Sequence, residues 1–445
     1  MKWQKLINDK RFGLEDYHDP HKNAIRTDFR RDYDRLVFSS PFRRLQNKTQ
    51  VFPLPGSIFV HNRLTHSMEV ACVGKSMADE IATGLRARYA DEEWSGLFNH
   101  LGDIVAAACL AHDLGNPPFG HSGEKAISTF FSEGAGKELR DRFTEQEWAD
   151  LTHFEGNANA FRVLTHQFKG RRRGGFAMTY STLASIVKYP FESRLATKNK
   201  FGFFSSEQED FKKVADELGI LSIPGPNGEM RYARHPLVYI VEAADDICYE
   251  VMDIEDAHKL KILSTQEVID AFLSYFPDER VEQMRRVMEM VTDPNEKIAY
   301  LRSCVVGVLV QRCAEAFLEA EDDILAGRFE GCLLDHIPER ERRGYARCNE
   351  ISWAKIYRSS DVVDIELAGN RIITFLLEKL TEAVLNPELN YSKLLMAKFP
   401  DQYDVGAPTL FGRIQAVLDH VSAMTDVYAL DLYRKLNGIQ LRIEN

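Results

Sequence analysis

An adjacent histidine and aspartate, His112 and Asp113, follow the apolar run of residues 104–110. A helix this apolar is expected to be buried, and an unpaired carboxylate is costly to bury. A bound divalent metal would satisfy both side chains. The alternative is an ordinary helix end, because Gly115 and the two prolines that follow it stop a helix. That alternative explains the glycine and the prolines but not the His-Asp pair.

Two further segments carry candidate metal ligands. His66 lies near the start of a predicted helix whose apolar positions extend to Leu85, and Asp245 lies on a second apolar helix. On that second helix, polar side chains spaced three, four and four residues apart share one face: Glu242, Asp245, Tyr249 and Asp253. Asp246 points about 100° away, so Asp245 is the preferred ligand. A solvated helix face is the alternative explanation for the stripe.

The ordered pattern of His66, then His112 and Asp113, then Asp245 resembles the H…HD…D signature of the HD phosphohydrolase superfamily. Two imidazoles and two carboxylates form a mixed nitrogen and oxygen site. Such a site suits Mg²⁺ or Mn²⁺, and also Fe²⁺, Co²⁺ or Ni²⁺, with water or phosphate oxygens in the open positions. We therefore predict that these four side chains bind a divalent metal.

Five ordered segments narrow the resemblance to the deoxyguanosine triphosphate triphosphohydrolase family. They are residues 42–52, 61–66, 112–124, 154–158 and 243–249, and residues 423–430 match more weakly. The resemblance implies an enzyme that cleaves a deoxynucleoside triphosphate (dNTP) at the α-phosphorus. Its products would be a deoxynucleoside and tripolyphosphate. The family is named for dGTP, and the sequence leaves the base preference open.

His121 and Glu124 are three residues apart at the start of a predicted helix, so their side chains can face the same point. A histidine backed by a carboxylate is a suitable general acid and base, because the carboxylate fixes the ring and raises its basicity. The resemblance implies that both positions are catalytic. Whether His121 acts on the attacking water or on the leaving oxygen stays open, and a surface histidine near a helix start is the alternative.

Four predicted residues would hold the triphosphate or lie beside it. The resemblance assigns Lys188 and Lys200 to the triphosphate and places His153 beside the active site, in contact with a phosphate or with a catalytic side chain. Arg63 lies three residues before His66, and its guanidinium is well suited to a phosphate oxygen. Exposed lysines and a structural histidine are the alternatives for Lys188, Lys200 and His153.

Three predicted residues would recognise the sugar. By resemblance, Gln50 and Asp253 contact the 3′-hydroxyl, and Tyr249 packs against the ring and leaves no room for a 2′-hydroxyl. Asp253 follows Asp245 by eight residues on the same helix face, so a shared pocket is geometrically reasonable.

The composition is that of a soluble globular protein. The 445 residues are 44% hydrophobic and 28% charged, with a net charge of −11. The negative charge argues against a general nucleic-acid binder but not against local basic residues that bind a polyanionic substrate. No apolar run approaches about 18 residues, so no membrane span is expected, and the start lacks the apolar core of a signal peptide. Seven scattered cysteines without a CxxC pair indicate reduced thiols in the cytoplasm.

The elements that must position these side chains are mainly α-helical. Helical patterns cover residues 64–85, 103–114, 157–168, 207–218, 236–257, 280–292, 299–325, 362–386 and 409–436. Two short β-hairpins are expected, one pairing residues 50–52 with 57–60 and one with a type I′ turn at Asn227-Gly228. We predict an all-α fold with an HD-domain core in residues 1–265. A C-terminal helical region, residues 266–445, would pack on that core or be continuous with it.

Three functions remain as alternatives. The first is a dNTP triphosphohydrolase. The second is another HD hydrolase, such as a nucleotidase or phosphodiesterase, and the third is a nucleotide sensor or single-stranded nucleic-acid binder, which would not need His121 and Glu124. The resemblance also implies a homo-oligomer, often a hexamer built from dimers, and a second nucleotide as activator. The arginine-rich loop of residues 171–175 is either a phosphate or nucleotide contact or a solvated run of charge.

Overall fold

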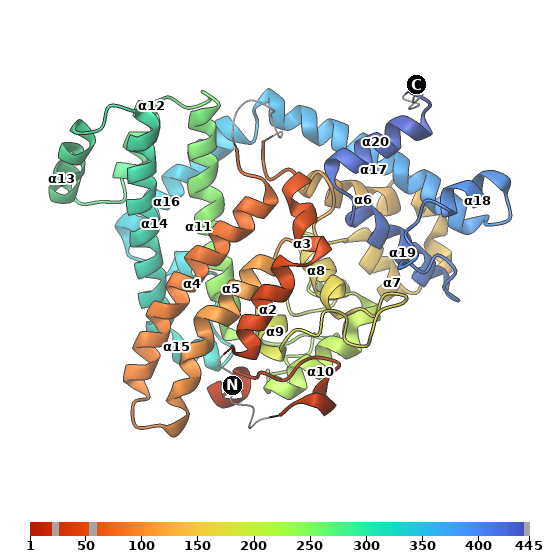
Figure 1. The fold of residues 1–445 in the computed structure, drawn as a ribbon, viewed down its shortest axis with the longest axis horizontal. Coiled ribbons are helices and arrows are strands. Elements are labelled where there is room, and N and C mark those ends of the chain that lie inside the picture. Colours follow the sequence, from red (N-terminus) through yellow and green to blue (C-terminus); the bar gives the residue numbers. More distant parts are fainter. Residues whose placement is uncertain (20–25, 53–59, 440–445) are drawn as a thin grey trace.

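The computed structural model describes residues 1–19, 26–52 and 60–439, and helices dominate it (Figure 1). Within these ranges there is no sheet, only isolated bridges such as the antiparallel pair Thr49 and Asn62. The predicted all-α class is therefore confirmed. None of the described helices is both long enough and apolar enough to cross a membrane.

The helices fall into three groups along the chain. The N-terminal group is α1 (Trp3–Leu6), η1 (Glu15–Tyr17), α2 (Asp28–Val37), α3 (Ser40–Arg44), η2 (Leu45–Asn47), α4 (Arg63–Arg88), η3 (Glu93–His100) and α5 (Leu101–Ala111). The central group is α6 (His121–Ser132), η4 (Ala135–Arg142), α7 (Glu145–Thr152), α8 (Gly156–Thr165), α9 (Tyr180–Ile186), η5 (Ser193–Leu195), η6 (Ser205–Glu207), α10 (Gln208–Leu218) and α11 (Pro236–Lys259). The C-terminal group is α12 (Thr265–Leu273), α13 (Asp278–Glu289), α14 (Pro294–Glu319), α15 (Glu321–Leu325), η7 (Leu333–Asp335), α16 (Glu339–Ile351), the π-helical turn η8 (Ser352–Ile356), α17 (Ser360–Leu385), α18 (Asn390–Met396), α19 (Leu410–Ser422) and α20 (Asp426–Leu436).

Helix α4 is the long element on which the core is built. Asn62 and Thr65 form a capping box at its start, which satisfies backbone N–H groups that the first turn leaves open. Its buried face carries Val70, Met77 and Ile81 at helical spacing. Through that face α4 packs against α5, α11 and α14. Helix α5 is apolar nearly all round, and ten of its eleven residues are buried, as expected for a helix enclosed by others.

The apolar side chains form two clusters. The larger one collects α4, α5, α11 and α14, and the smaller one collects α6, α17, α19 and α20. In Figure 1 the elements of the first cluster extend to the left of the molecule, and α17 to α20 lie at the upper right. The predicted boundary between residues 265 and 266 lies at the start of α12, and the division into two regions stays a prediction.

Two of the predicted helices are each broken in two. The single helix predicted for residues 299–325 is two helices in the structure, α14 and α15, which meet at Ala320. The pattern of residues 409–436 is α19 and α20, separated by a turn in which Thr425 caps α20 by accepting a hydrogen bond from the N–H of Tyr428. The apolar period continues across both breaks, so hydrophobic periodicity alone does not reveal them.

The hairpins differ from the prediction. The second one forms one bridge, between Ser222 and Tyr232, and three backbone hydrogen bonds join residues 221–225 to residues 229–233. Its turn has Pro226 and Asn227 at the centre, followed by Gly228. Gly228 has a positive φ of 83° but Asn227 does not, so the type I′ turn was wrong. The first predicted hairpin includes residues 53–59, which lie outside the described residues; its flanks approach through the bridge between Thr49 and Asn62.

A buried ion cluster joins α8 to the C-terminal helices. Arg162 on α8 donates to both carboxylate oxygens of Asp419 on α19, at 2.8 Å each, and to Glu207. All three side chains are almost fully buried. Burial alone would raise the pKa of Glu207, but Arg162 holds that pKa below its ordinary value. The negative charges of Asp419 and Glu207 are therefore compensated only while Arg162 is present.

Replacing Arg162 with Met should strongly destabilise the protein, because two buried carboxylates lose their common partner. We expect the free energy of unfolding to fall by about 3–5 kcal/mol, measured by urea denaturation. The control is Arg140→Met, which removes an arginine that is 39% exposed and should change stability by about 0.5 kcal/mol or less. Equal small effects of both substitutions would contradict a structural role for the cluster.

Candidate metal centre and active site

Three helices bring His66, His112 and Asp245 to one point. His66 is on the first turn of α4, His112 directly follows α5, and Asp245 is in the middle of α11. The Nε2 atom of His66 lies 3.0 Å from Oδ1 of Asp245, and Nε2 of His112 lies 3.4 Å from the same oxygen. One ligand atom from each residue lies within 4.8 Å of the others, a spacing that suits a shared metal ion.

The ring of His112 is oriented by its other nitrogen. Nδ1 lies 2.6 Å from the carbonyl oxygen of Cys109, and this bond turns Nε2 toward Asp245. Nε2 is buried and has no hydrogen-bond partner among the described residues. An orphaned imidazole nitrogen beside a carboxylate fits a metal ligand, so the residues present suit the predicted cation.

The electrostatics of the group favour a positive charge at this point. Burial opposes ionisation of Asp245, yet the two imidazoles hold its pKa well below the ordinary value. Burial would also lower the pKa of His112, but Asp113 and Asp245 raise it to about 9. A divalent cation would supply that positive charge while leaving both imidazoles neutral.

Asp113, the fourth predicted ligand, lies beside this group rather than within it. Its Oδ1 is 3.6 Å from Nε2 of His112, and its Oδ2 accepts a hydrogen bond from Nη1 of Arg63 at 2.8 Å. The side chain of Asn116 also donates to Oδ1. Arg63 is only 4% exposed, and its guanidinium orients Asp113 through this hydrogen bond. The predicted contact of Arg63 with a phosphate stays a prediction.

Close packing behind the ligands is provided by small and sulfur-containing residues. Cys109 and Cys248 are buried free thiols, as expected for packing residues, and burial raises the pKa of each well above its ordinary value. Gly74 on α4 faces this layer, where an added Cβ would come within 2.7 Å of the sulfur of Cys109. A larger residue would push α4 away from α5 and thereby separate His66 from His112.

His121 and Glu124 form the predicted pair at the start of α6. Nδ1 of His121 lies 3.0 Å from Oε2 of Glu124, and the N–H of Gly156 donates to Oε1 of the same carboxylate at 2.7 Å. The His121 side chain is 72% exposed, so its other nitrogen is open to a ligand. The bond to Glu124 raises the pKa of His121; burial would raise that of Glu124, but His121 holds it below the ordinary value.

The loop that leads into α6 has a constrained backbone. Phe119 and Gly120 both have positive φ, 61° and 57°. Asp426 holds the first of them, since its Oδ1 accepts the N–H of Phe119 at 2.9 Å, and a Cβ on Gly120 would collide with the guanidinium of Arg63. The C-terminal helix α20 therefore helps to aim His121.

Each of the two lysines predicted to bind phosphate is paired with a different carboxylate. Nζ of Lys188 lies 3.1 Å from Glu242, a residue that also accepts a hydrogen bond from Arg234. Nζ of Lys200 donates to Glu155 at 2.8 Å. Burial and the charge of Glu124 raise the pKa of Glu155, while Lys200 opposes that rise. Both ammonium groups are thus held near the site by buried acidic partners.

A pocket of about 660 Å³ adjoins the group formed by His66, His112 and Asp245, called here the metal group. It is lined by Gln50, His121 and Tyr249 of the predicted site, together with Trp353 and Tyr357 near the π-helical turn. The ring of Tyr249 is 6.5 Å from that of His66 and 5.9 Å from that of Tyr357. A π-helical turn is often found where function requires it, and here it places two aromatic rings at the wall.

The remaining predicted residues fall at the edges of this arrangement. Asp253 accepts a hydrogen bond from the hydroxyl of Tyr357 at 2.9 Å, which ties α11 to the segment after the π-helical turn. Gln50 has a buried Oε1 without a partner among the described residues, a free acceptor beside the pocket. His153 ends α7 with Nδ1 on the carbonyl of Ala149, and its neighbour Glu155 is the residue that reaches Lys200.

Several residues of the site were not predicted. Glu155 and Glu242 hold the two lysines predicted to bind phosphate, Asp426 accepts the N–H of Phe119 before His121, and Tyr357 belongs to the C-terminal half. Glu242 belongs to the polar stripe of α11, and Glu155 lies in the matching segment of residues 154–158, so the sequence contained a signal for both. Asp426 lay in the weakly matching segment of residues 423–430, whereas Tyr357 had no signal that could be read without the fold.

Comparison with known proteins agrees with this geometry. Residues 63–247 match the HD domain family, and residues 336–435 match the phosphohydrolase-associated domain family. The chain is 36% identical to a deoxyguanosinetriphosphate triphosphohydrolase-like protein of Pseudomonas aeruginosa, over 98% of this chain and 99% of that one. A protein of the same name from Synechocystis is also 36% identical, over 99% and 100%. A deoxyguanosinetriphosphate triphosphohydrolase of Yersinia enterocolitica is 29% identical, over 97% and 98%.

Replacing Asp245 with Asn should remove bound metal, because the only carboxylate within the three-residue group loses its charge. We expect the affinity for Mn²⁺ to fall by more than about 100-fold, measured by equilibrium dialysis and elemental analysis. Asp246→Asn is the matched control, since the neighbouring carboxylate lies outside that group, and it should retain the ion. Retention of Mn²⁺ by the Asp245 variant would contradict the assignment.

Replacing Glu124 with Gln should lower the pKa of His121, because the neutral amide no longer favours the imidazolium. The expected change is a downward shift of that pKa, followed by NMR titration of the His121 ring. Gln keeps an oxygen that can accept the N–H of Gly156, so the start of α8 should be preserved. An unchanged His121 titration would show that Glu124 does not control the ring.

Proposed function

The chain belongs to the HD-domain family of deoxyguanosinetriphosphate triphosphohydrolases, and from that premise we propose that it cleaves dGTP or other dNTPs to deoxynucleoside and tripolyphosphate. Members of this family are hydrolases that act on triphosphates. The proposal concerns the deoxynucleotide substrate, the bond that is cleaved and the residues that cleave it.

One observation supports the proposal: a group of side chains spaced for a metal ion and a carboxylate-backed histidine lie next to the same pocket. His66, His112 and Asp245 form the group, and His121 lines the pocket with Tyr249, whose ring contacts that of His66. A hydrolase of phosphate esters needs a cation for the phosphate and a proton donor or acceptor for the reacting oxygens. A binding protein would need only the first.

The three grouped residues, with Asp113 as the fourth ligand, would hold the divalent ion. When bound, such an ion neutralises the α-phosphate and activates a water molecule. The ligand types suit Mg²⁺ or Mn²⁺, and Fe²⁺, Co²⁺ or Ni²⁺ as alternatives. Arg63 supports this set by holding Asp113, which leaves Oδ1 of that carboxylate directed toward His112.

His121 would hold the proton that the leaving 5′-oxygen requires. Glu124 raises the pKa of His121 and therefore favours the protonated ring, which suits an acid better than a base. Glu124 fixes the ring through Nδ1, so the proton for transfer would be carried on Nε2. Gly156 holds the carboxylate in turn, so α8 positions the pair.

The substrate would be held along α11 and the pocket wall. Lys188 and Lys200 would exchange their carboxylate partners for oxygens of the triphosphate, with His153 nearby. Tyr249 would pack against the deoxyribose, where a 2′-hydroxyl would clash, and Gln50 and Asp253 would contact the 3′-hydroxyl. The free acceptor on Gln50 supports that contact, because a hydroxyl can donate to it.

Other features implied by the resemblance stay predictions. They are a homo-oligomer built from dimers and activation by a second nucleotide. Binding of single-stranded DNA, an alternative function, and a cytoplasmic location, which rests on the scattered cysteines, also stay predictions. The division into regions 1–265 and 266–445 belongs with them, as does the base preference.

The proposed reaction predicts its products. The protein with Mn²⁺ or Mg²⁺ should convert at least one dNTP to deoxynucleoside and tripolyphosphate, separated by ion-exchange chromatography, while the matching ribonucleotide reacts more slowly. His121→Ala should keep its metal and lose turnover by about 100-fold or more. Monophosphate or inorganic phosphate as the product would assign the chain to another HD hydrolase class, and no turnover of any nucleotide would favour a sensor.

A further inference from the structure

The two lysines proposed to hold the triphosphate differ in what their carboxylate partners keep once the lysines move to a ligand. Lys188 is paired with Glu242, whose other oxygen accepts a hydrogen bond from Arg234 at 2.8 Å. Glu242 therefore retains one cation after Lys188 leaves. Glu155 accepts a hydrogen bond from Lys200 at 2.8 Å and has no second ion-pair partner among the described residues. The departure of Lys200 would leave Glu155 without a compensating charge.

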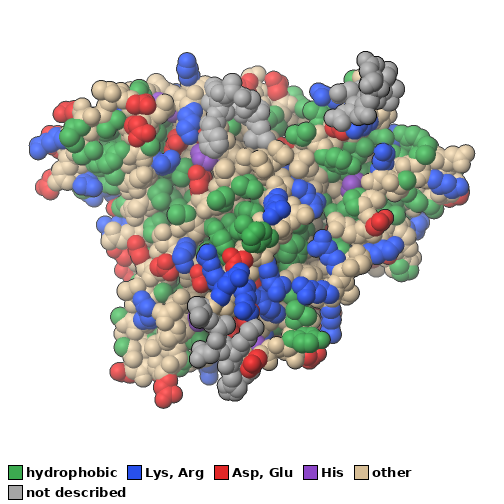
Figure 2. Space-filling view, in the orientation of Figure 1, with side chains coloured by type: hydrophobic (Ala, Val, Ile, Leu, Met, Phe, Trp, Pro, Cys, Tyr) green, Lys and Arg blue, Asp and Glu red, His purple; other side chains and the backbone are tan. Residues whose placement is uncertain are grey.

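Glu155 is buried, so water does not readily replace the lysine. An exposed ion pair separates at little cost, because both charges are hydrated afterwards, and Figure 2 shows many Lys and Arg side chains exposed on one face of the molecule. The side chain of Glu155 is only 3% exposed, whereas that of Lys200 is 33% exposed and is freer to move. An ionised carboxylate left alone at such a buried position is costly.

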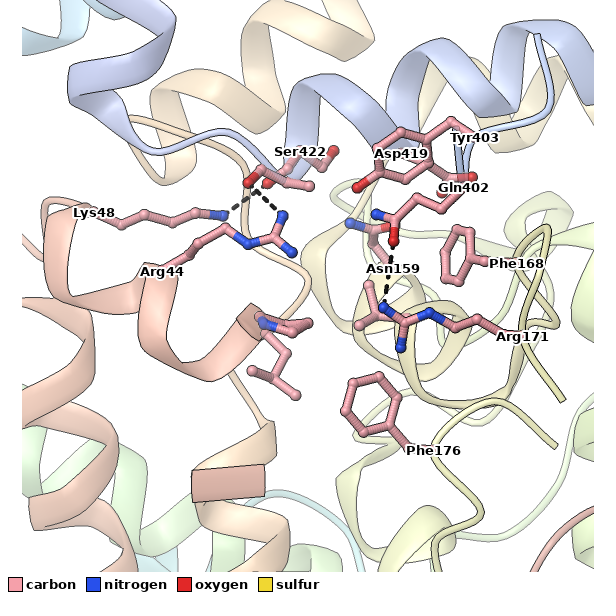
Figure 3. Close-up of a pocket in the computed structure, with 14 residues that line it drawn as sticks. Arg44, Lys48, Asn159, Phe168, Arg171, Phe176, Gln402, Tyr403, Asp419 and Ser422 are labelled. Atoms are coloured by element: carbon pink, nitrogen blue, oxygen red, sulfur yellow. Dashed lines mark hydrogen bonds between the residues drawn. The ribbon is translucent and has the colours of Figure 1, made fainter. Parts of the chain in front are cut away.

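Helix α8 prevents Glu155 from following Lys200. Oε2 of Glu155 caps this helix by accepting backbone N–H groups of its first turn. Further along α8, the side chain of Asn159 donates to a backbone carbonyl of the loop after α5 at 2.7 Å, and Arg162 is bound by Asp419 of α19. Figure 3 shows Asn159 and Asp419 at this junction of the two helices. Glu155 is therefore fixed, and its charge has to be compensated where it stands.

The groups that face Glu155 favour a proton as the replacement for the lysine. Glu124 faces it from α6, and Lys200 and Tyr189 face it from the segment between α9 and η6. Burial and the charge of Glu124 raise the pKa of Glu155 to about 7, although Lys200 opposes that rise. Loss of the ammonium would raise this pKa further. Burial would also raise the pKa of Glu124, but its bond to His121 holds that pKa at about 2, so the proton goes to Glu155.

We propose that Glu155 is a positioning residue that exchanges a lysine for a proton when the triphosphate binds. In the empty site its carboxylate holds Lys200. When Lys200 moves to the triphosphate, the oxygen that it leaves, Oε1, takes one proton from the solvent, while Oε2 continues to cap α8. The charge beside Glu124 thus stays balanced, and the ion pair of Glu124 with His121 is preserved. This step rests on the proposed function, because it requires contact between Lys200 and the triphosphate.

The exchange makes binding depend on pH. The pKa of Glu155 is higher in the occupied site than in the empty one, so protonation favours the bound state. This contribution to affinity is fully present below a pH of about 7, and it is lost as the pH rises through the higher pKa of the occupied site. Between the two values the affinity should fall by up to about tenfold per pH unit. Glu155→Gln cannot bind this proton, so its affinity should depend less on pH.

The test is calorimetric titration of the full chain with inorganic tripolyphosphate at about pH 8, in buffers that differ in ionisation enthalpy. The dependence of the binding enthalpy on the buffer gives the number of protons taken up. We expect the unchanged protein to take up about one proton more than Glu155→Gln, whose amide oxygen can still cap α8. Lys200→Gln should match Glu155→Gln in proton uptake, because Glu155 then has no ammonium to lose.

The matched control is Glu242→Gln, which makes the same substitution at the carboxylate that holds the other lysine. It should keep the proton uptake of the unchanged protein. A proton bound by Asp246, which faces Lys188, is common to the unchanged protein and Glu155→Gln and cancels in their comparison.

Three results would overturn the proposal. They are equal proton uptake by Glu155→Gln and the unchanged protein, loss of the uptake in Glu242→Gln instead, and binding of tripolyphosphate that is absent or is unaffected by Lys200→Gln. The third result would also remove the contact of Lys200 from the proposed function. Equal uptake in a protein that hydrolyses dNTPs would refute the exchange at Glu155 alone and leave the proposed function standing.

Discussion

The structure depends on one constraint: two imidazoles and a carboxylate from three different helices must meet inside an apolar core. His66, His112 and Asp245 come from α4, from the end of α5 and from α11, and no pair of them is close in sequence. Their charges are balanced only together, so the three helices must keep a fixed separation. The glycine at position 74 and the small residues of α5 allow that separation, and the bond from His112 to the carbonyl of Cys109 fixes the ring that faces inward.

The C-terminal helices fix residues of the candidate site, and among the described residues the grouped metal-ligand candidates all come from the helices before them. The carboxylate of Asp426 accepts hydrogen bonds from the backbone N–H groups of Thr49 and Phe119. It therefore fixes both the segment before Gln50 and the loop before His121. Tyr357 holds Asp253, and the π-helical turn before it forms the outer wall of the pocket. The proposed metal ligands and the His121–Glu124 pair therefore lie in the HD region, and the helices after it fix residues that line the pocket.

Local signals in the sequence were sufficient for the centre of the site. An apolar run that ends in His-Asp, and a pair of residues at helical spacing, depend on neighbours within a few positions, and the structure places His112 beside Asp245 and His121 beside Glu124. Contacts between distant segments could not be predicted in this way. Lys48 binds carbonyls 68 and 374 residues away, and the break at Thr425 lies inside a continuous apolar period. The assignment of Lys188 and Lys200 to phosphate gave no hint that Glu242 and Glu155 hold them.

The most direct test of the metal centre is a crystal structure with Mn²⁺, located by its anomalous scattering. The account predicts one strong peak within coordination distance of Nε2 of His66, Nε2 of His112 and a carboxylate oxygen of Asp245, with Asp113 as the fourth protein ligand. A peak held by other residues, or none at saturating Mn²⁺, would contradict the claim that this junction of α4, α5 and α11 is built to bind a cation.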